Sequence, residues 1–266
     1  MSHTYEAKAV EALVQLGLMT AHDQLDGAAQ KAAADNWSYS HFLGYLLDAE
    51  LKGKYQRTVA MNTRFAHFPY RKQLEDFDFK AQPSIDPKII DELATMRFLA
   101  EGRNVVLLGP PGVGKTHLAI ALAVKAIEAG HRAYFINAMD MARKLAEATE
   151  GNHLPRLIKN LTKMRLLILD ELGYLELSKP QASLLFQVIS LRYEAALPII
   201  LTSNKAFGDW ASVFAADHVM ASAALDRLLH KSTIINIRGD SYRLKEKRLA
   251  GISTNINSHS IQPDQS

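Results

Sequence analysis

The sequence contains no cysteine in its 266 residues. This absence excludes disulfide bonds, cysteine nucleophiles and cysteine-based zinc sites. The sequence also lacks any run of about 18 apolar residues, so it predicts no membrane-spanning helix and no membrane partner. Its first residues, MSHTYEAKAVEA, do not have the pattern of a secretory signal peptide. Together these absences predict a cytoplasmic protein, and the hydrophobic content of 48% is ordinary for a globular one.

Acidic residues are absent from one segment, Leu51 to Leu74, although the net charge of the whole chain is only +3. Aromatic residues are interleaved with basic residues throughout this segment. The basic residues are Lys52, Lys54, Arg57, Arg64, Arg71 and Lys72. Such a segment suits the phosphate backbone of DNA, through counterion release and ring contacts. The same pattern also fits a solvated helix face, so these residues are candidates for DNA contacts and the alternative stays open.

The amino-terminal part of the chain has a helical pattern. Apolar residues at helical spacing predict a helix over residues 5–18. Either Ser38 or Ser40 is positioned to cap a second, longer helix. We therefore expect a small all-helical domain over residues 1–70. Three prolines then interrupt the pattern, which predicts a linker over residues 71–88.

Beyond the linker, short apolar runs alternate with helical stretches. The runs are NVVLLG (104–109), RAYFIN (132–137), RLLILD (165–170), PIILTS (198–203) and TIINIR (233–238). This alternation predicts an α/β domain over residues 89–250, in which helices cover both faces of a parallel sheet. The polar residues 251–266 are expected to form a disordered tail.

The segment GPPGVGKT, residues 109–116, matches the phosphate-loop pattern G-x-x-x-x-G-K-[ST] between a predicted strand and a predicted helix. Its glycines let backbone N–H groups surround the phosphates of ATP, and the helix N-terminus favours negative charge. Lys115 can reach the β- and γ-phosphates, which makes it a catalytic candidate as well, and Thr116 can hold Mg²⁺. The predicted nucleotide-binding residues are Gly109, Pro110, Pro111, Gly112, Val113, Gly114, Lys115, Thr116 and His117.

A pair of carboxylates stands at the end of the apolar run LLILDE, residues 166–171. Ligands of open α/β sheets bind at the carboxyl ends of the strands, so Asp170 is expected beside Thr116, where it would hold Mg²⁺ through water. Glu171 is positioned to polarise a water molecule for attack on the γ-phosphate. A strand that ends in Asp-Glu is common, and it predicts hydrolysis here because a phosphate loop accompanies it.

A polar triplet ends the run PIILTSN at the same predicted sheet edge. Asn204 is the preferred candidate for orienting the attacking water or touching the γ-phosphate. Thr202 and Ser203 are the next candidates, and a simple turn-forming role for Asn204 is the alternative.

The motifs GPPGVGKTHLA, LLILDELGYL, IILTSN and STIINIRGDSYRLKEKR resemble those of AAA+ ATPases. Two of the motifs, DELGYL and STIINIRGDSYRLKEKR, are shared by far fewer ATPases than the others. They are similar to motifs of the IstB-like transposition helpers, which are related to DnaC-type helicase loaders. The resemblance implies a five-stranded parallel sheet between helices, with ATP and Mg²⁺ as ligands. It also implies duplex DNA and the transposase of the same element as partners. Assembly of the chain into a ring or spiral, with a nucleotide between adjacent subunits, is implied as well.

The resemblance gives Arg227, within LDRL, the role of an arginine finger that reaches the γ-phosphate in a neighbouring subunit. A local ion pair with Asp226 or Glu194 is the alternative. Arg238 and Arg243 are candidates for phosphate sensing or DNA contact. The residues beyond the fifth strand are too few for the usual helical lid, so no carboxyl-terminal lid domain is expected.

Three functions are compatible with these patterns. The first is an ATP-dependent, DNA-binding helper of a transposase that hydrolyses ATP between subunits. The second is a DnaC-type loader of a replicative helicase, whose ATP site would be the same. The third is a small-molecule P-loop kinase, which needs an arginine-bearing lid and an acceptor pocket that the sequence does not reveal. The narrow motifs favour the first.

Overall fold

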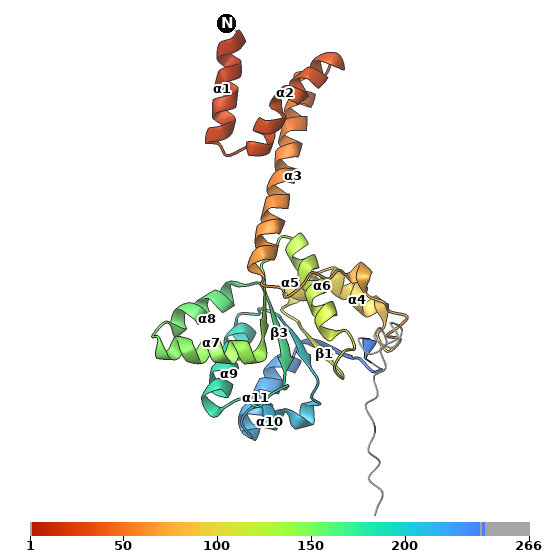
Figure 1. Ribbon diagram of the computed structural model, residues 1–266, viewed down its shortest axis with the longest axis vertical. Coiled ribbons are helices and arrows are strands. Elements are labelled where there is room, and N and C mark those ends of the chain that lie inside the picture. The colour runs from red at the N-terminus through yellow and green to blue at the C-terminus, as the bar shows by residue number, and fades with distance from the viewer. Residues whose placement is uncertain (1, 240, 243–266) are drawn as a thin grey trace, which may run out of the picture. The chain divides into compact units, whose positions relative to one another are not determined.

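The computed structural model describes residues 2–239, 241 and 242 (Figure 1). It divides into two compact units, Met1–Arg64 and Phe65–Ser266. The predicted tail over residues 251–266, the position of Arg243 and the region where a lid would follow lie outside the described residues. Within the described part of the chain, no helix combines the length and the apolar character that a membrane span requires.

The N-terminal unit consists of helices α1 (Ser2–Gln15), α2 (Met19–Ala34) and α3 (Tyr39–Phe65). The hydroxyl of Ser38 accepts a hydrogen bond from the backbone N–H of His41 at 3.2 Å, so Ser38 caps α3 as expected. The helix α2 was not predicted, because its sequence MTAHDQLDGAAQKAAA is rich in alanine and has little apolar periodicity. Its side chains are small, and they form a thin core with α3.

The second unit contains a five-stranded parallel sheet in the order β2-β3-β4-β1-β5. Each strand falls on one of the five predicted apolar runs. Their bounds are β1 (Asn104–Leu108), β2 (Ala133–Asn137), β3 (Leu166–Leu172), β4 (Ile199–Ser203) and β5 (Ser232–Asn236). The strands β1, β3 and β4 read as continuous apolar runs because helices bury both of their faces.

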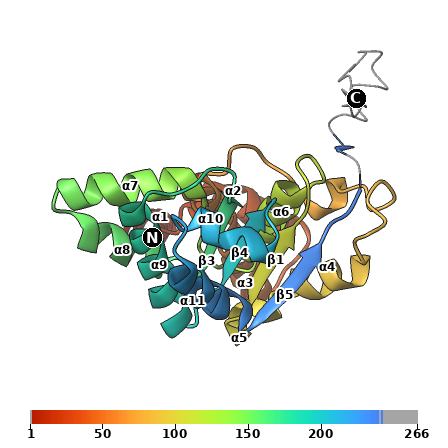
Figure 2. The same ribbon diagram turned by 90° about the horizontal axis from the view of Figure 1, so that it is seen from below.

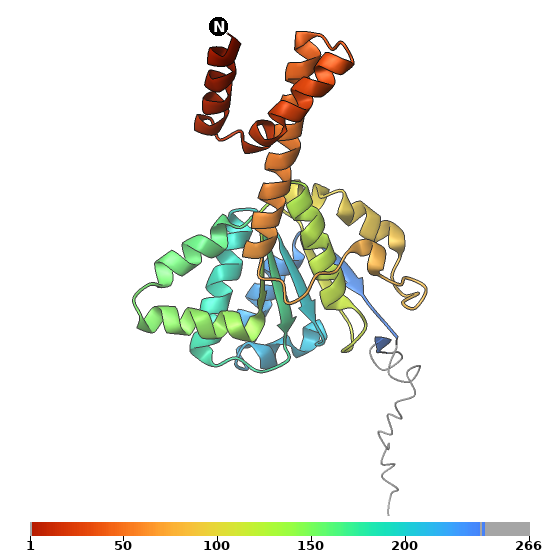
Figure 3. The ribbon, with the colours of Figure 1, turned by 45° about the horizontal axis from the view of Figure 1, so that its top comes forward.

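Helices cover the sheet in two layers (Figures 2 and 3). On one face, α6 (Lys115–Glu128) packs against the strands and against α4 (Pro87–Ala94); α6 lies in front of the strands in Figure 3. Right-handed crossovers place the other helices on the opposite face, where they pack in an apolar cluster with β2, β3 and β4. This layer contains α7 (Ala138–Glu150), α8 (Leu154–Lys163), α9 (Lys179–Glu194) and α11 (His218–Leu229). Short helices complete the unit: η1 (Leu74–Asp76), α5 (Arg97–Glu101), η2 (Phe207–Asp209) and α10 (Trp210–Val213).

All five strands are parallel, so the sheet has two chemically different edges. The edge where the strands end is here called the carboxyl edge, and it leads into the phosphate loop after Leu108. The edge where the strands begin is called the amino edge, and Asn104 lies there. This polarity matters because ligands of parallel sheets bind at the carboxyl edge.

Candidate ATP site

The phosphate loop joins β1 to α6 at the carboxyl edge. Gly114 precedes α6 with a φ of +98°, and a Cβ atom built on it would lie 2.6 Å from the ring of Phe77. Both the left-handed backbone and the close ring therefore require glycine at this position. The ammonium of Lys115 is largely buried and donates to the carbonyl oxygens of Gly109 and Pro110, at 2.7 and 2.8 Å. The loop thus places a cation and a helix N-terminus at one point, which is the requirement for binding phosphate.

The segment before the α/β core packs on the start of α6. The ring of Phe77 meets the ring of His117 edge to face, with centroids 5.2 Å apart. The Nε2–H group of His117 donates to the carbonyl oxygen of Gln73 at 3.0 Å, and burial lowers the pKa of this histidine. His117 therefore links the linker segment to the phosphate-binding helix.

Two hydroxyl groups hold the carboxylate of Asp170. Thr116 donates to the Asp170 carboxylate at 3.0 Å, and Thr202 donates to it at 2.6 Å. Asp170 is buried, which raises its pKa, while these two hydrogen bonds act in the opposite direction. The predicted proximity of Thr116 and Asp170 is therefore present in the structure, and Thr202 completes the cluster.

The backbone at Glu171 departs from regular strand geometry. Pairing of β3 with β4 shifts register between Leu169 and Leu172, and Glu171 has a φ of +57°. The shift leaves the backbone N–H of Glu171 to donate to the hydroxyl oxygen of Thr202 at 2.9 Å. Its exposed carboxylate accepts a hydrogen bond from the side-chain amide of Asn137 at 2.7 Å. A left-handed backbone at a non-glycine residue is a strained feature that is common at functional sites.

The oxygen donors at this edge fit a magnesium ion bound together with phosphates. Thr116 and Asp170 supply one hydroxyl and one carboxylate, which are the hard oxygen ligands that Mg²⁺ prefers. Among the described residues, no group of three or more histidine, aspartate or glutamate side chains forms a metal site by itself. A site of this composition needs the phosphates of a nucleotide as further ligands.

Asn204 follows the last residue of β4 and is exposed at the carboxyl edge. Thr202, one of the weaker candidates, is fully buried and links Asp170 to the backbone of Glu171. Ser203 is also buried, and it donates to the carbonyl oxygen of Leu172. The sequence analysis preferred Asn204 and placed Thr202 and Ser203 after it. Thr202 bonds to both Asp170 and Glu171 because β3 and β4 shift register, and no feature of the sequence predicts that shift.

Arg227 lies near the amino edge. Its backbone carbonyl accepts from the side chain of Asn104 at 3.4 Å, and Asn104 is the first residue of β1. Its guanidinium donates to the carbonyl of Ala223 at 3.0 Å and lies 5.0 Å above the ring of Phe186. Within the described residues it forms no ion pair. The length of β1 separates this contact from the phosphate loop of the same chain by about 13 Å.

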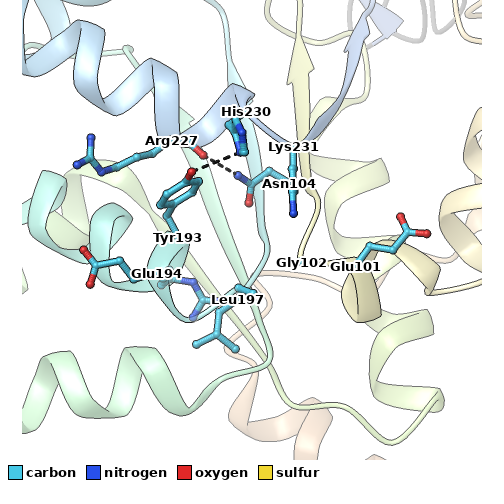
Figure 4. A pocket seen from close by; sticks show the side chains of 11 residues that line it. Glu101, Gly102, Asn104, Tyr193, Glu194, Leu197, Arg227, His230 and Lys231 are labelled. Atoms are coloured by element: carbon cyan, nitrogen blue, oxygen red, sulfur yellow. Dashed lines mark hydrogen bonds between the residues drawn. The ribbon is translucent and has the colours of Figure 1, made fainter.

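A pocket of about 240 Å³ lies beside Arg227 (Figure 4). In Figure 4 the guanidinium of Arg227 points away from Asn104 and His230. Asn104 also donates to the carbonyl of Leu228 at 2.9 Å and accepts from the backbone N–H of Ile199 at 2.8 Å. This buried amide therefore fixes the last turn of α11, from which Arg227 projects.

Another arginine, Arg192, lies at the same edge and, unlike Arg227, is fully buried. Arg192 of α9 donates to four backbone carbonyl groups, those of Leu161, Met164, Arg165 and Pro198, at 2.6 to 3.4 Å. Burial lowers the pKa of Arg192 to about 9. Its guanidinium joins the end of α8 to the starts of β3 and β4, so Arg192 is part of the scaffold.

The basic residues of the acid-free segment have different surroundings. Arg57 donates to Thr20 at 2.7 Å and pairs with the buried carboxylate of Glu50 at 2.6 Å, while Lys52 pairs with Asp48 on the same helix. Arg57 thus ties α3 to α2. Four of the basic residues are exposed or partly exposed, and they have no ion-pair partner within the described residues. They are Lys54, Arg64, Arg71 and Lys72.

Arg238 is exposed just beyond β5. Its backbone N–H donates to the hydroxyl of Ser84, which in turn donates to the carbonyl of Arg238, both at 2.9 Å. The preceding residue, Ile237, donates its N–H to the carbonyl of Leu108 at the end of β1. Arg238 therefore lies at the carboxyl edge, next to the start of the phosphate loop.

The strand order, the phosphate loop and the Asp170–Thr116 pair define a P-loop nucleotide-binding protein. Among solved structures, the DnaC helicase loader is similar with a TM-score of 0.50 and 25% identity, over 57% of this chain and 87% of that one. The AMPPCP-bound DnaA of Aquifex aeolicus is similar with a TM-score of 0.54 and 20% identity, over 72% of this chain and 58% of that one. The fold is therefore that of the AAA+ proteins.

Sequence comparison gives the family. Residues 10–250 match the family of IstB-like ATP binding proteins. An ATP-binding protein of insertion sequence IS21 from Pseudomonas aeruginosa is 50% identical over 230 residues, 86% of each chain. One of insertion sequence IS5376 from Geobacillus stearothermophilus is 46% identical over 235 residues, 88% of this chain and 93% of the relative. The chain belongs to the IstB-like family of ATP-binding AAA+ proteins.

Proposed function

We propose that this protein is the ATP-dependent helper of a transposase in insertion-sequence transposition. It assembles on duplex DNA with ATP and hydrolyses ATP between adjacent subunits. The observation that carries the ATPase assignment is the cluster of Thr116, Asp170, Thr202 and Glu171 beside the phosphate loop. The relatives at 46 and 50% identity are insertion-sequence proteins, which favours a transposase over a replicative helicase as the client.

The residues of the site divide the chemistry of hydrolysis among them. The phosphate loop and Lys115 hold the phosphates, and the carboxylate of Glu171 accepts the proton of the attacking water. Thr116 and Asp170 hold Mg²⁺, which neutralises charge on the phosphates when it is bound. Asn137 and Thr202 orient Glu171 through its side chain and its backbone. Asn204 contacts the water or the γ-phosphate from the end of β4.

Arg227 completes the site of a neighbouring subunit. Its helix ends at the amino edge, away from the phosphate loop of its own chain, so it serves a second copy of the chain. A guanidinium supplied in this way stabilises the charge that develops on the phosphates during hydrolysis. ATP bound between two copies then favours the assembled state, and loss of the γ-phosphate removes that preference.

The replacement Glu171→Gln tests the catalytic assignment. We expect it to lower the steady-state rate of ATP hydrolysis about 10²- to 10⁴-fold, because the amide cannot accept the proton. ATP affinity, measured with a fluorescent analogue, is expected to be unchanged, and assemblies with DNA should become long-lived. The matched control is Glu176→Gln, which changes the same charge on the exposed loop after β3. Normal turnover by the Glu171 variant would contradict the assignment.

The basic residues of α3 test the DNA-binding part of the proposal. On a helix with 3.6 residues per turn, Lys54 and Arg64 lie about 80° apart around the axis. Replacing both with glutamine should lower the slope of log K against log salt concentration by about 2 units for duplex DNA, because each phosphate contact contributes about 0.9. The matched control replaces Lys8 and Lys31, which lie on α1 and α2 of the same unit. Equal slopes for the two double variants would assign the segment to a solvated helix face.

A further inference from the structure

The loop after β3 carries two exposed apolar side chains close to the catalytic glutamate. Tyr174 is 65% exposed and Leu175 is 55% exposed, and both belong to the motif DELGYL, of which ATP hydrolysis uses only the two carboxylates. The loop is fixed at both ends. The backbone N–H of Tyr174 donates to the carbonyl of Glu171 at 3.3 Å, and that of the buried Leu177 donates to the last carbonyl of α10 at 3.2 Å. Tyr174 and Leu175, called the β3 tip below, are therefore held in water beside the site, which suits contact with a partner.

The outer side of α11 carries a second exposed apolar surface. On the inner side of this helix, Ala221, Ala224 and Leu228 are buried in the core. The outer side has a shallow hollow of about 590 Å³, and Val219, its largest apolar residue, is 82% exposed. The residues that line the hollow, called the α11 face below, are His218, Val219, Ser222, Ala223, Asp226 and Arg227. Because Arg227 lies at one end of this face, the subunit that Arg227 contacts also meets the rest of the face.

The dimensions of α11 and of the sheet fit such a contact. Val219 precedes Arg227 by eight residues, which is about 12 Å along a helix. In the sheet, β4 lies between β1 and β3, so the end of β3 is about 10 Å from the phosphate loop that follows β1. When Arg227 reaches the γ-phosphate of a neighbouring copy and α11 points toward β3, Val219 lies over the β3 tip of that copy. In the opposite direction β5, the last strand, is only about 5 Å from β1, so Val219 would extend past the sheet.

Charges along the same path are complementary. Asp226 is exposed on the α11 face, and Lys205 lies just beyond the end of β4, between β1 and β3. The stem of Lys205 covers Gly173 at the base of the β3 tip, where an added Cβ atom would lie 2.8 Å from the lysine Cγ atom. Neither Asp226 nor Lys205 forms an ion pair within the part of the chain that the structure describes. A helix that points toward β3 brings these two opposite charges together.

We propose that, in the ATP-bridged assembly, α11 of one copy lies across the ends of β1, β4 and β3 of the next copy. The α11 face then covers the β3 tip, and Asp226 pairs with Lys205. This inference rests on the proposed function and adds the surface that positions the finger. Because Tyr174 is hydrogen-bonded to Glu171, the contact that brings Arg227 to the γ-phosphate also holds the backbone of the glutamate. Val219, Tyr174 and Lys205 are thus positioning residues.

Charge reversal tests the ion pair. Asp226→Lys and Lys205→Asp should each raise the protein concentration needed for assembly about 10-fold, because each places like charges at every interface. Sedimentation velocity with duplex DNA and a non-hydrolysable ATP analogue measures this concentration. An equimolar mixture of the two variants should assemble better than either alone, because the changed α11 of one then meets the changed β4 end of the other. The controls Asp91→Lys and Lys80→Asp make the same changes at exposed positions before β1 and should assemble as the wild type does.

Cysteine cross-linking tests the direction of α11, and the chain contains no natural cysteine. Cα atoms within about 7 Å can form a disulfide. A mixture of Val219→Cys and Leu175→Cys proteins should cross-link on oxidation with the ATP analogue and DNA, and neither should do so alone. Tyr242→Cys is the control, because Tyr242 is exposed next to the phosphate loop on the β5 side. It should not cross-link to Val219→Cys.

Three results would overturn this inference alone, provided that the wild type assembles and Arg227→Ala loses hydrolysis. They are charge reversals that assemble as well as their controls, a mixture no better than its components, and cross-linking of Val219→Cys to Tyr242→Cys in place of Leu175→Cys. A wild-type protein that fails to assemble with the analogue and DNA would overturn the proposed function as well. Circular dichroism and the affinity for a fluorescent ATP analogue show whether each variant is folded.

Discussion

The two edges of the sheet use polar side chains in different ways. At the carboxyl edge a set of polar side chains bond to one another: Thr116 and Thr202 to Asp170, and Asn137 to Glu171. At the amino edge Arg192 and Asn104 bond to the main chain: Arg192 donates to four carbonyl groups, and Asn104 both donates to a carbonyl and accepts from a backbone N–H. A network of side chains can rearrange around a ligand, whereas carbonyls of the main chain are fixed by the fold. The first edge is therefore suited to chemistry and the second to support.

Arg227 is the exception at the amino edge. Among the described residues, its guanidinium donates to a single carbonyl, that of Ala223, and lies over one face of Phe186. Arg192, which lies nearby on α9, is fully buried and has four carbonyl partners. The four hydrogen bonds of Arg192 suit a side chain that stabilises the fold. The single hydrogen bond of the Arg227 guanidinium leaves that group available to a neighbouring subunit.

The largest effect is expected for Arg227→Ala. Loss of the finger should lower the rate of ATP hydrolysis about 10³-fold or more, because the transition-state charge loses its guanidinium. The free energy of unfolding should change by only about 1 kcal/mol, since one hydrogen bond and one ring contact are lost. Steady-state hydrolysis and urea denaturation measure the two quantities.

A mixing experiment extends this test. Arg227→Ala protein has an intact phosphate site, and Glu171→Gln protein has an intact finger. Mixing them should restore part of the activity, because some interfaces then contain both groups. Wild-type rates from a strictly monomeric preparation, or from the Arg227 variant alone, would show that no finger acts between subunits.

The next effect concerns Arg192→Met, which keeps an unbranched apolar chain and removes the guanidinium donors. We expect the free energy of unfolding to fall by about 3 kcal/mol, because four buried carbonyl groups lose a partner. The folded fraction should still bind ATP normally. Urea denaturation measures the loss, with Arg227→Ala as the reference. A variant as stable as the wild type would mean that the buried guanidinium costs as much in desolvation as its hydrogen bonds return.

The sequence was sufficient for the parts of the site that are local in the chain. Lys115 and Thr116 belong to an eight-residue pattern, and Asp170 and Glu171 end an apolar run, so each could be found without a partner. The five strands were found for the same reason, because each is a short apolar run between helices. What a parallel sheet adds is proximity between residues far apart in the chain.

The positions that the sequence did not reveal depend on that proximity. Asn137 reaches Glu171 across 34 positions, because β2 and β3 pair with Asn137 opposite Asp170. Its sequence signal is only that of a residue that caps α7. Arg192 lies within a helical run whose apolar pattern gives no reason to expect a buried cation. Its carbonyl partners lie in α8 and in the residues just before β3 and β4, so the folded chain alone brings them together.

The smallest effect is expected for Thr202→Val, which allows the buried hydroxyl of Thr202 to be compared with the exposed amide of Asn204. Thr202→Val keeps the shape of the side chain and removes the hydroxyl that donates to Asp170 and accepts from the N–H of Glu171. We expect kcat to fall about 10-fold, which corresponds to the 1 to 2 kcal/mol of one or two hydrogen bonds, while the KM for ATP changes little. Thr202→Ser keeps the hydroxyl and should stay within about twofold of the wild type. If Asn204→Ala proves more damaging than Thr202→Val, the exposed amide at the end of β4 outweighs the buried hydroxyl. The network of side chains would then support the site without determining its rate.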